Sequence, residues 1–96
     1  MDKRFWILYG WINRGKQRKE VIFHTPETPF TTQELRKEIN SKSKLKLSLR
    51  EMSRHLTSFR TKGLLSCLTP KAPYGRLYLI TKLGKRIKKE LRGKNF

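Results

Sequence analysis

The segment from Ser48 to Ile80 restricts the possible folds of this chain more than any other part of the sequence. Through SLREMSRHLTSFRTKG, apolar residues recur at spacings of three, four and three, which is the period of one helix face. These residues are Leu49, Met52, Leu56 and Phe59. Ser48 and Glu51 make a capping box, and Gly63 stands where helices commonly end in a left-handed residue. The sequence therefore predicts an amphipathic helix over residues 48–62.

A β-hairpin is predicted directly after this helix. The runs LLSCLT (Leu64 to Thr69) and RLYLI (Arg76 to Ile80) have the length and composition of strands. The intervening PKAPYG contains two prolines and a glycine, so it can continue neither strand. We expect two short strands joined by a six-residue basic tip.

A helix followed at once by a β-hairpin is the order of parts in a winged helix-turn-helix. Three short motifs carry a resemblance to a family: SRHL (Ser53 to Leu56), KGL (Lys62 to Leu64) and GRLYLITKLG (Gly75 to Gly84). They resemble the motifs S-R-x-L, K-G-L and G-R-x-Y-x-L-T-x-x-G of archaeal and bacterial winged helix-turn-helix transcriptional regulators. The resemblance runs from about Gly15 to Lys89. It implies an α+β fold, mostly α, with a three-helix core, a two- to three-stranded β-wing and a C-terminal helix.

Two further helices are predicted ahead of the Ser48–Ile80 segment. The stretch NRGKQRKEVIFHT contains the first, with Val21 and Ile22 as core contacts. After a proline-containing loop, Thr31 and Glu34 make a second capping box, which opens a short amphipathic helix. This helix would be the positioning helix of the helix-turn-helix.

The connection between the two helices of the helix-turn-helix, residues 40–47, is longer than the usual three or four residues. Leu45 and Leu47 are expected to anchor it to the core, while the lysines between and before them face outwards. The sequence departs here from the tight-turn pattern, so the angle between the two helices does not follow from it.

A last helix is predicted after the hairpin. Thr81 can cap it, and Leu83, Ile87 and Leu91 form one apolar stripe at spacings of four. Most other residues in this helix are basic or small. Gly93 is expected to end it.

The N-terminal stretch FWILYGWI, Phe5 to Ile12, is the most apolar part of the chain. Its odd and even positions are both hydrophobic, so periodicity does not separate a strand covered on both sides from a short helix in a dimer contact. Two roles stay open as well: an interface, or closure of the core by Trp6, Tyr9 and Trp11. We treat residues 1–96 as a single domain, with residues 1–12 as an N-terminal strand or interface segment and residues 13–92 as the core.

Charge indicates the class of partner. The chain has 24 Lys and Arg residues against 7 Asp and Glu, a formal charge of +17 spread over its whole length. Such a charge opposes compact folding through self-repulsion unless a polyanion neutralises it, and nucleic acid is the expected polyanion. A membrane is not expected as a partner, because no apolar run approaches the roughly 18 residues that span a bilayer.

Chemistry of other kinds has little support in the sequence. Cys67 is the sole cysteine, which excludes an intrachain disulfide and a cysteine cluster for zinc, and its strand position favours a small buried side chain. His24 and His55 have no acidic or thiol partner at ligand spacing. No paired carboxylates or nucleophile arrangement stand out, so we expect a non-enzyme without metal, cofactor or small-molecule ligand. The N-terminus lacks a secretory signal pattern, so a cytoplasmic, nucleoid-associated protein is expected.

The resemblance implies a place for each contact with DNA. The helix over residues 48–62 would enter the major groove, where Arg can bond guanine and Ser or Thr can bond several base edges. The base-contact candidates are Arg50, Ser53, Arg54 and Thr57. The wing, residues 70–76, would reach the backbone or the minor groove. Candidates for backbone contact are Lys16, Arg18, Lys42, Lys44, Lys46, Ser58, Lys71, Tyr74 and Arg76.

These observations predict a sequence-specific regulator that binds double-stranded DNA as a homodimer. The dimer would use the Phe5–Trp11 stretch, either alone or with the Leu83/Ile87/Leu91 helix. An architectural DNA-binding protein, or a ribosome- or RNA-associated protein, remains the alternative, because winged helices serve all these partners. Ser and Thr interleaved with Arg on the 48–62 helix favour the regulator, since a purely electrostatic binder has no need of them.

Overall fold

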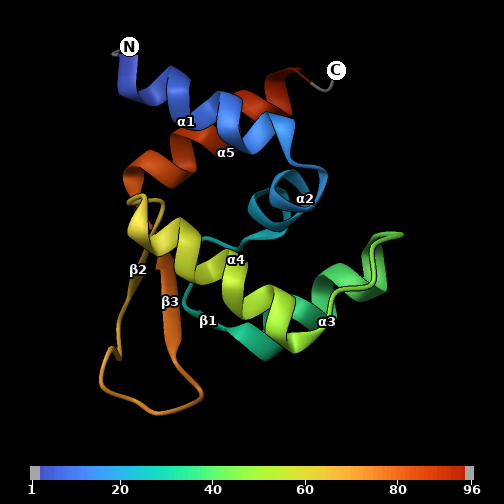
Figure 1. The fold of residues 1–96 in the computed structure, drawn as a ribbon, viewed down its shortest axis with the longest axis vertical. Coiled ribbons are helices and arrows are strands. Elements are labelled where there is room, and N and C mark those ends of the chain that lie inside the picture. Colours follow the sequence, from blue (N-terminus) through green and yellow to red (C-terminus); the bar gives the residue numbers. More distant parts are fainter. Residues whose placement is uncertain (1–2, 95–96) are drawn as a thin grey trace.

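The computed structural model describes residues 3–94, which form five helices and one antiparallel three-stranded sheet (Figure 1). The predicted α+β class, mostly helical, is confirmed. In chain order the elements are α1 (Lys3–Arg14), α2 (Lys16–His24), β1 (Phe30–Thr31), α3 (Thr32–Lys42), α4 (Leu49–Thr61), β2 (Leu65–Cys67), β3 (Leu77–Ile80) and α5 (Lys82–Lys94).

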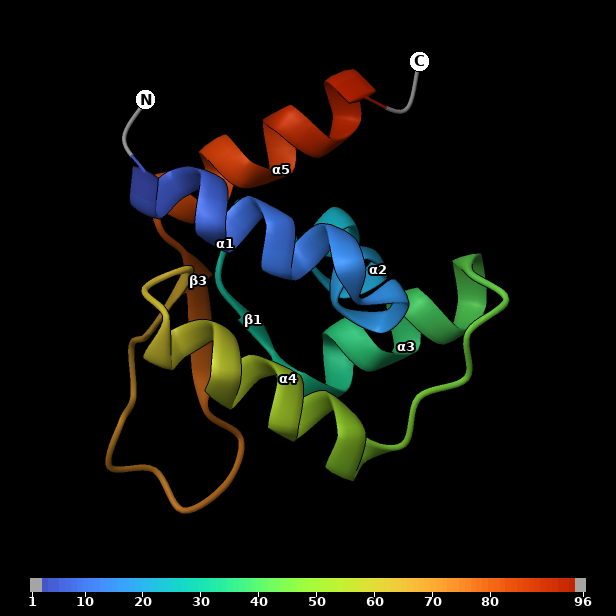
Figure 2. The same ribbon diagram turned by 45° about the horizontal axis from the view of Figure 1, so that its top comes forward.

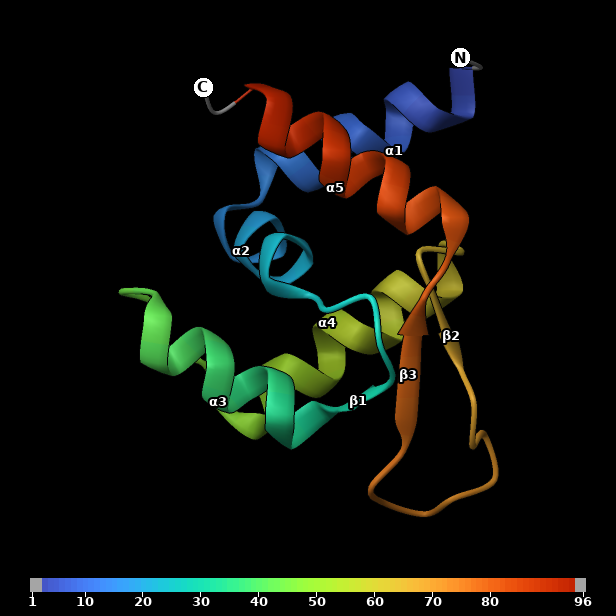
Figure 3. The same ribbon diagram turned by 180° about the vertical axis from the view of Figure 1, so that it is seen from behind.

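The sheet has the order β1-β3-β2, with β3 in the centre. The predicted hairpin is confirmed: β2 pairs with β3 so that Leu65 faces Ile80. The two-residue strand β1 adds to the other edge of β3, with Phe30 opposite Tyr78. Since β1 runs directly into α3, this pairing fixes the start of α3 beside the hairpin (Figure 3).

Both predicted capping boxes are present. At the start of α4 the backbone N–H of Ser48 donates to Glu51 Oε1 (2.9 Å), and the N–H of Glu51 donates to Ser48 Oγ (3.1 Å). Thr31 and Glu34 make the same pair of hydrogen bonds at α3. Gly63 follows α4 with φ of +81°, a backbone conformation that side-chain-bearing residues rarely adopt. The predicted start and end of the 48–62 helix are therefore confirmed.

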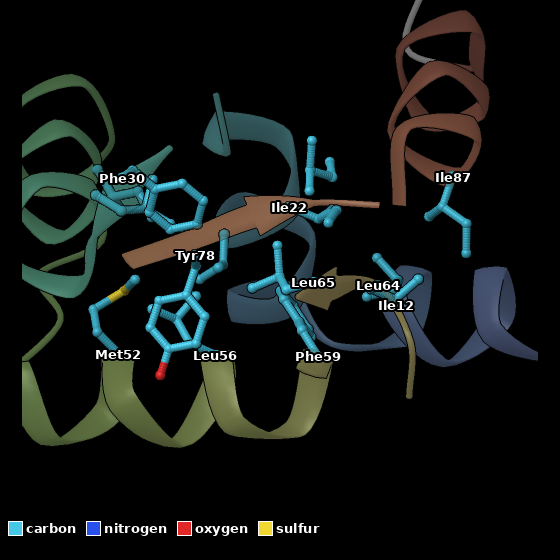
Figure 4. Close-up of a cluster of buried hydrophobic side chains, with 14 of the residues drawn as sticks. Ile12, Ile22, Phe30, Met52, Leu56, Phe59, Leu64, Leu65, Tyr78 and Ile87 are labelled. Atoms are coloured by element: carbon cyan, nitrogen blue, oxygen red, sulfur yellow. The ribbon is translucent and has the colours of Figure 1, made fainter. Parts of the chain in front are cut away.

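The core forms between α4, the sheet and the other helices. Figure 4 shows Met52, Leu56 and Phe59 rising from α4 toward the sheet, where Leu65 and Tyr78 lie. All three α4 side chains are fully buried. Leu49 was expected in the same stripe, and that prediction is wrong: its side chain is 49% exposed. It sits in the first turn of α4, beyond the edge of the core.

Helix α1 corrects the strand alternative for the apolar N-terminal stretch. Phe5, Leu8 and Ile12 recur at helical spacing and are buried in the core. Trp6 and Ile7 lie on the outer side of α1, 47% and 60% exposed. Apolar residues thus occupy both faces of one helix, which is why the sequence showed no period.

Helix α5 packs side by side with α1 at one end of the molecule and also contacts α2 (Figure 2). Ile87 and Leu91 are buried there and Leu83 is half-buried. The expected use of this stripe in a dimer contact is wrong, because the chain's own core covers it. Thr81 caps α5 as predicted, accepting a hydrogen bond from the N–H of Gly84 (3.1 Å). The helix does not end at Gly93 but continues to Lys94.

The connection between α3 and α4 is held by a side chain that the sequence did not single out. The amide of Asn40 donates to the carbonyl of Leu47 (2.9 Å) and accepts from the N–H of the same residue (2.8 Å). Arg36 donates to that carbonyl as well (3.0 Å). Leu47 is buried and Leu45 packs against the core, as expected. Together these contacts fix α4 relative to α3.

Candidate nucleic-acid interface

The four base-contact candidates lie on one exposed face of α4. Arg50, Ser53, Arg54 and Thr57 follow one another at spacings of three, one and three, and each is exposed. The opposite face of α4 is buried, so the helix is fixed with this face outwards. Two guanidinium groups and two hydroxyl groups are thereby presented together on a rigid element.

One side of this face borders a groove that we call the loop-side groove, lined by Leu49, Ser53, Thr57, Tyr74 and Arg76 among others, with a volume of about 490 Å³. Its far wall is the loop between β2 and β3, residues 68–76, which projects past the end of the sheet in Figure 1. Tyr74 is 86% exposed at its tip, and Lys71 is exposed nearby. Arg76 is half-buried and donates to the carbonyl of Ala72 (3.0 Å), which braces the loop.

The other side of the α4 face borders a second groove, whose lining includes Trp11, Arg18, Arg54 and Ser58. Ser58 is exposed, as expected of a backbone-contact candidate. Arg18 is half-buried, lies over the Trp11 ring with its guanidinium carbon 4.5 Å from the centroid, and donates to the Trp11 carbonyl. One of its five N–H donors is thus used within the chain, and the ring contact holds the guanidinium in place.

Three of the remaining lysine candidates meet elsewhere. Lys16, Lys42 and Lys44 line a groove of about 580 Å³ between α2 and the α3–α4 connection. Lys19 and the exposed Phe23 line the same groove, and sequence reasoning missed both because nothing in the pattern separates them from ordinary positions of the first helix. Lys46 is exposed and donates to the carbonyl of Asn40. Lys42 also pairs with Glu38 on α3.

His55 links α4 to α2 behind the exposed face. Its Nε2 lies 2.9 Å from Gln17 Oε1. The pKa of the imidazole lies below its ordinary value of 6.5, chiefly because burial disfavours the charged form and secondarily because Arg18 is close; Glu51 partly opposes the shift. The histidine is therefore a neutral packing residue at neutral pH.

This lowered pKa predicts a loss of stability in mild acid. As the pH falls below 6.5, the unfolded chain takes up a proton at His55 before the folded chain does, so the free energy of unfolding decreases. We expect the decrease between roughly pH 7.5 and roughly pH 6 to be smaller in His55→Asn than in the wild type, measured by urea unfolding. His24 is present in both proteins and serves as the internal control. An equal decrease in the free energy of unfolding of the wild type and of His55→Asn would contradict the assignment of this pH dependence to His55.

Glu51 caps the start of α4. The pKa of its carboxyl is lowered, first by the backbone N–H of Ser48 and then by the Ser48 hydroxyl. One of its carboxylate oxygens accepts a hydrogen bond from the Ser48 N–H at the start of α4.

The side chain of Cys67 in β2 is half-buried, so it is less buried than expected from its strand position.

Within residues 3–94, no three His, Cys, Asp or Glu side chains gather into a possible metal site. Across the same residues, none of the helices combines the length and the apolar character needed to cross a bilayer. Comparisons with known protein families, with curated proteins and with solved structures find no match to this chain.

Proposed function

We propose that this chain is a winged helix-turn-helix protein that binds double-stranded DNA in a sequence-specific manner and regulates transcription. In this proposal α4 is the recognition helix, which enters the major groove, and residues 70–76 are the wing on the backbone or minor groove. The carrying observation is the exposed α4 face, where Arg50, Ser53, Arg54 and Thr57 project together beside the loop-side groove.

The dimensions and chemistry of this face suit the major groove. A helix with its side chains is about 10–12 Å across, and the major groove of B-DNA is about 12 Å wide. Arg50 and Arg54 can each make a bidentate contact to guanine, and the hydroxyls of Ser53 and Thr57 can donate or accept. A surface that served only to neutralise phosphate would need no hydroxyl groups at these positions.

The flanking groups suit the phosphate backbone. Lys71 and Tyr74 at the tip of the β2–β3 loop lie to one side of the α4 face, and Ser58 lies to the other. Such contacts position a protein on the duplex without reading its sequence. The formal charge of +17 supplies the long-range attraction. We therefore propose that the protein associates with the nucleoid. We also propose that it acts by binding and has no enzymatic activity.

Assembly as a homodimer belongs to the same proposal. Trp6 and Ile7 form an exposed apolar pair on α1, away from the core. A two-fold contact through this pair would present two copies of α4 to one duplex. Half-sites about one helical turn apart would then be read together.

The proposal is tested by selecting binding sites from a pool of random duplexes in the presence of excess nonspecific DNA. We expect enrichment of a palindrome whose two half-sites lie about 10 base pairs apart. Affinity for it should fall with salt with a log–log slope of roughly −4 to −9, corresponding to about 5 to 10 neutralised phosphates.

Three outcomes would change the conclusion. Enrichment of a single half-site would remove the homodimer and leave the DNA reader. Failure to enrich any sequence, with comparable affinity for structured RNA, would replace the regulator by the architectural or RNA-associated alternative. A flat salt response would contradict a nucleic-acid role altogether.

A further inference from the structure

Helix α5 carries a continuous basic stripe that the proposed DNA contacts do not use. Its members recur at spacings of three, one, three and three, which places them along one face of a helix. All are exposed, whereas the opposite face holds the buried Ile87 and Leu91. The members of this α5 stripe are Lys82, Lys85, Arg86, Lys89 and Arg92.

Among the acidic side chains of residues 3–94, few neutralise any part of the stripe. Lys85 Nζ lies 3.9 Å from a carboxylate oxygen of Glu27, and both side chains are largely exposed, so this pair contributes little. Glu90 is half-buried one turn after Arg86, and it makes no ion pair among the described residues. Like charges three and four residues apart on a helix repel one another and destabilise it. An unneutralised stripe of this kind therefore opposes the folding of α5.

Neighbouring contacts mark the border of the stripe. Lys88 turns inward: its Nζ donates to the carbonyl of Thr25 (2.6 Å), and burial lowers its pKa. Arg86 is anchored at the inner edge, with its guanidinium carbon 5.4 Å from the centroid of the Phe5 ring. The cations that remain on the outer face are thus held on a packed helix, in a fixed row.

The α5 stripe and the exposed face of α4 belong to different sides of the molecule. Helix α4 lies in front of α3 in Figure 1, and α5 lies in front of α1 in Figure 3, which shows the molecule from behind. The two helices meet at one end, where the Thr81 hydroxyl before α5 donates to the carbonyl of Gly63 after α4 (2.7 Å), and from there α5 packs along α1 and α2. A straight duplex seated on the N-terminal half of α4 therefore leaves the part of the stripe beyond Lys82 free.

We propose that the α5 stripe binds a second segment of duplex DNA, so that one protein molecule holds two segments at once. From the first to the last member the stripe spans about 15 Å at 1.5 Å per residue. Over that length a duplex carries about nine phosphate charges. The stripe contains Lys and Arg without Ser, Thr, Asn or Gln, so this second contact follows the backbone and is independent of sequence.

A capture assay tests this inference. One duplex is immobilised, the protein is bound to it and the unbound protein is washed away, and a labelled random duplex is then added. The test variant is Lys85→Gln, Lys89→Gln and Arg92→Gln. The control removes the same charge at exposed positions outside both surfaces, with Lys3→Gln, Arg14→Gln and Lys37→Gln. We expect about a tenfold or larger loss of capture in the test variant and little change in the control.

Binding of each variant to the immobilised duplex is measured in the same experiment and reports whether the protein is folded. We expect the α5 variant to retain this first binding while it loses capture. Capture equal to that of the wild type would overturn the inference, because a second copy of α4 would then hold the labelled duplex. Equal losses in test and control variants would also overturn it, since charge alone would then explain capture. Neither readout depends on sequence specificity, so the inference fails separately from the proposed function.

Discussion

Replacing Arg54 with Ala is expected to lower the affinity for the selected site by about 1–3 kcal/mol, and the affinity for random duplex by much less. Arg54 lies at the centre of the exposed α4 face, with Arg50 one turn before it. A bidentate bond to guanine exists only where the correct base is present, so its loss reduces the ratio of specific to nonspecific binding. Fluorescence anisotropy on both duplexes at one salt concentration measures this ratio.

Lys71→Ala is the matched control, because it removes the same charge from the exposed tip of the β2–β3 loop. A phosphate contact there should weaken binding to both duplexes by a similar small factor and reduce the magnitude of the salt slope by about one. If Arg54→Ala also weakened both duplexes equally, α4 would not read bases, and the architectural or RNA-associated alternative would be favoured.

Gly84→Ala is expected to destabilise the fold by about 1–3 kcal/mol or more, although alanine is the better helix former. A Cβ atom at position 84 would lie 2.4 Å from the carbonyl oxygen of Leu64 and 2.7 Å from Cγ1 of Ile80. The first of these atoms belongs to the backbone ahead of β2 and cannot rotate away. Helix α5 would have to move off the sheet, which a urea titration would detect as a lower midpoint.

Gly10→Ala, the same substitution at another helix position, is expected to stabilise the fold. Gly10 is inside α1, and a Cβ atom there would meet nothing within 4 Å. The variant should therefore gain about 0.5–1 kcal/mol of stability from helix propensity. If both variants shifted the midpoint in the same direction, the close packing of α5 on the strands would not be the cause of the Gly84 effect.

Local rules in the sequence predict the elements that carry their own boundary signals. Helix α4 has a capping box at its start and a left-handed glycine after its end, and the residues that make both signals lie within or next to the helix itself. The hairpin is predictable for the same reason, since prolines and a glycine interrupt two apolar runs. The clustering of Arg50, Ser53, Arg54 and Thr57 follows directly from helical spacing.

Features that depend on packing between distant segments could not be predicted in this way. Apolar residues on both faces of α1 remove its period, and only the burial of Phe5 and Ile12 excludes a strand. Leu49 matches the apolar stripe in spacing but lies beyond the end of the core. Spacing alone leaves open whether the apolar stripe on α5 joins a dimer contact, because its partner surface, on α1 and α2, is more than 50 residues away in the chain.

The hydrogen bonds of the Asn40 amide determine which insertions this chain can tolerate during evolution. In a tight helix-turn-helix the length of the turn sets the angle between the helices, so an insertion alters the geometry. Here two hydrogen bonds between Asn40 and Leu47, with a third from Arg36 to Leu47, hold the connection. Lys44 and Lys46 are exposed, while Leu45 between them packs against the core. Insertions beside the two lysines would therefore lengthen the connection while leaving α4 in its orientation, whereas position 40 stays constrained to a side chain that both donates and accepts.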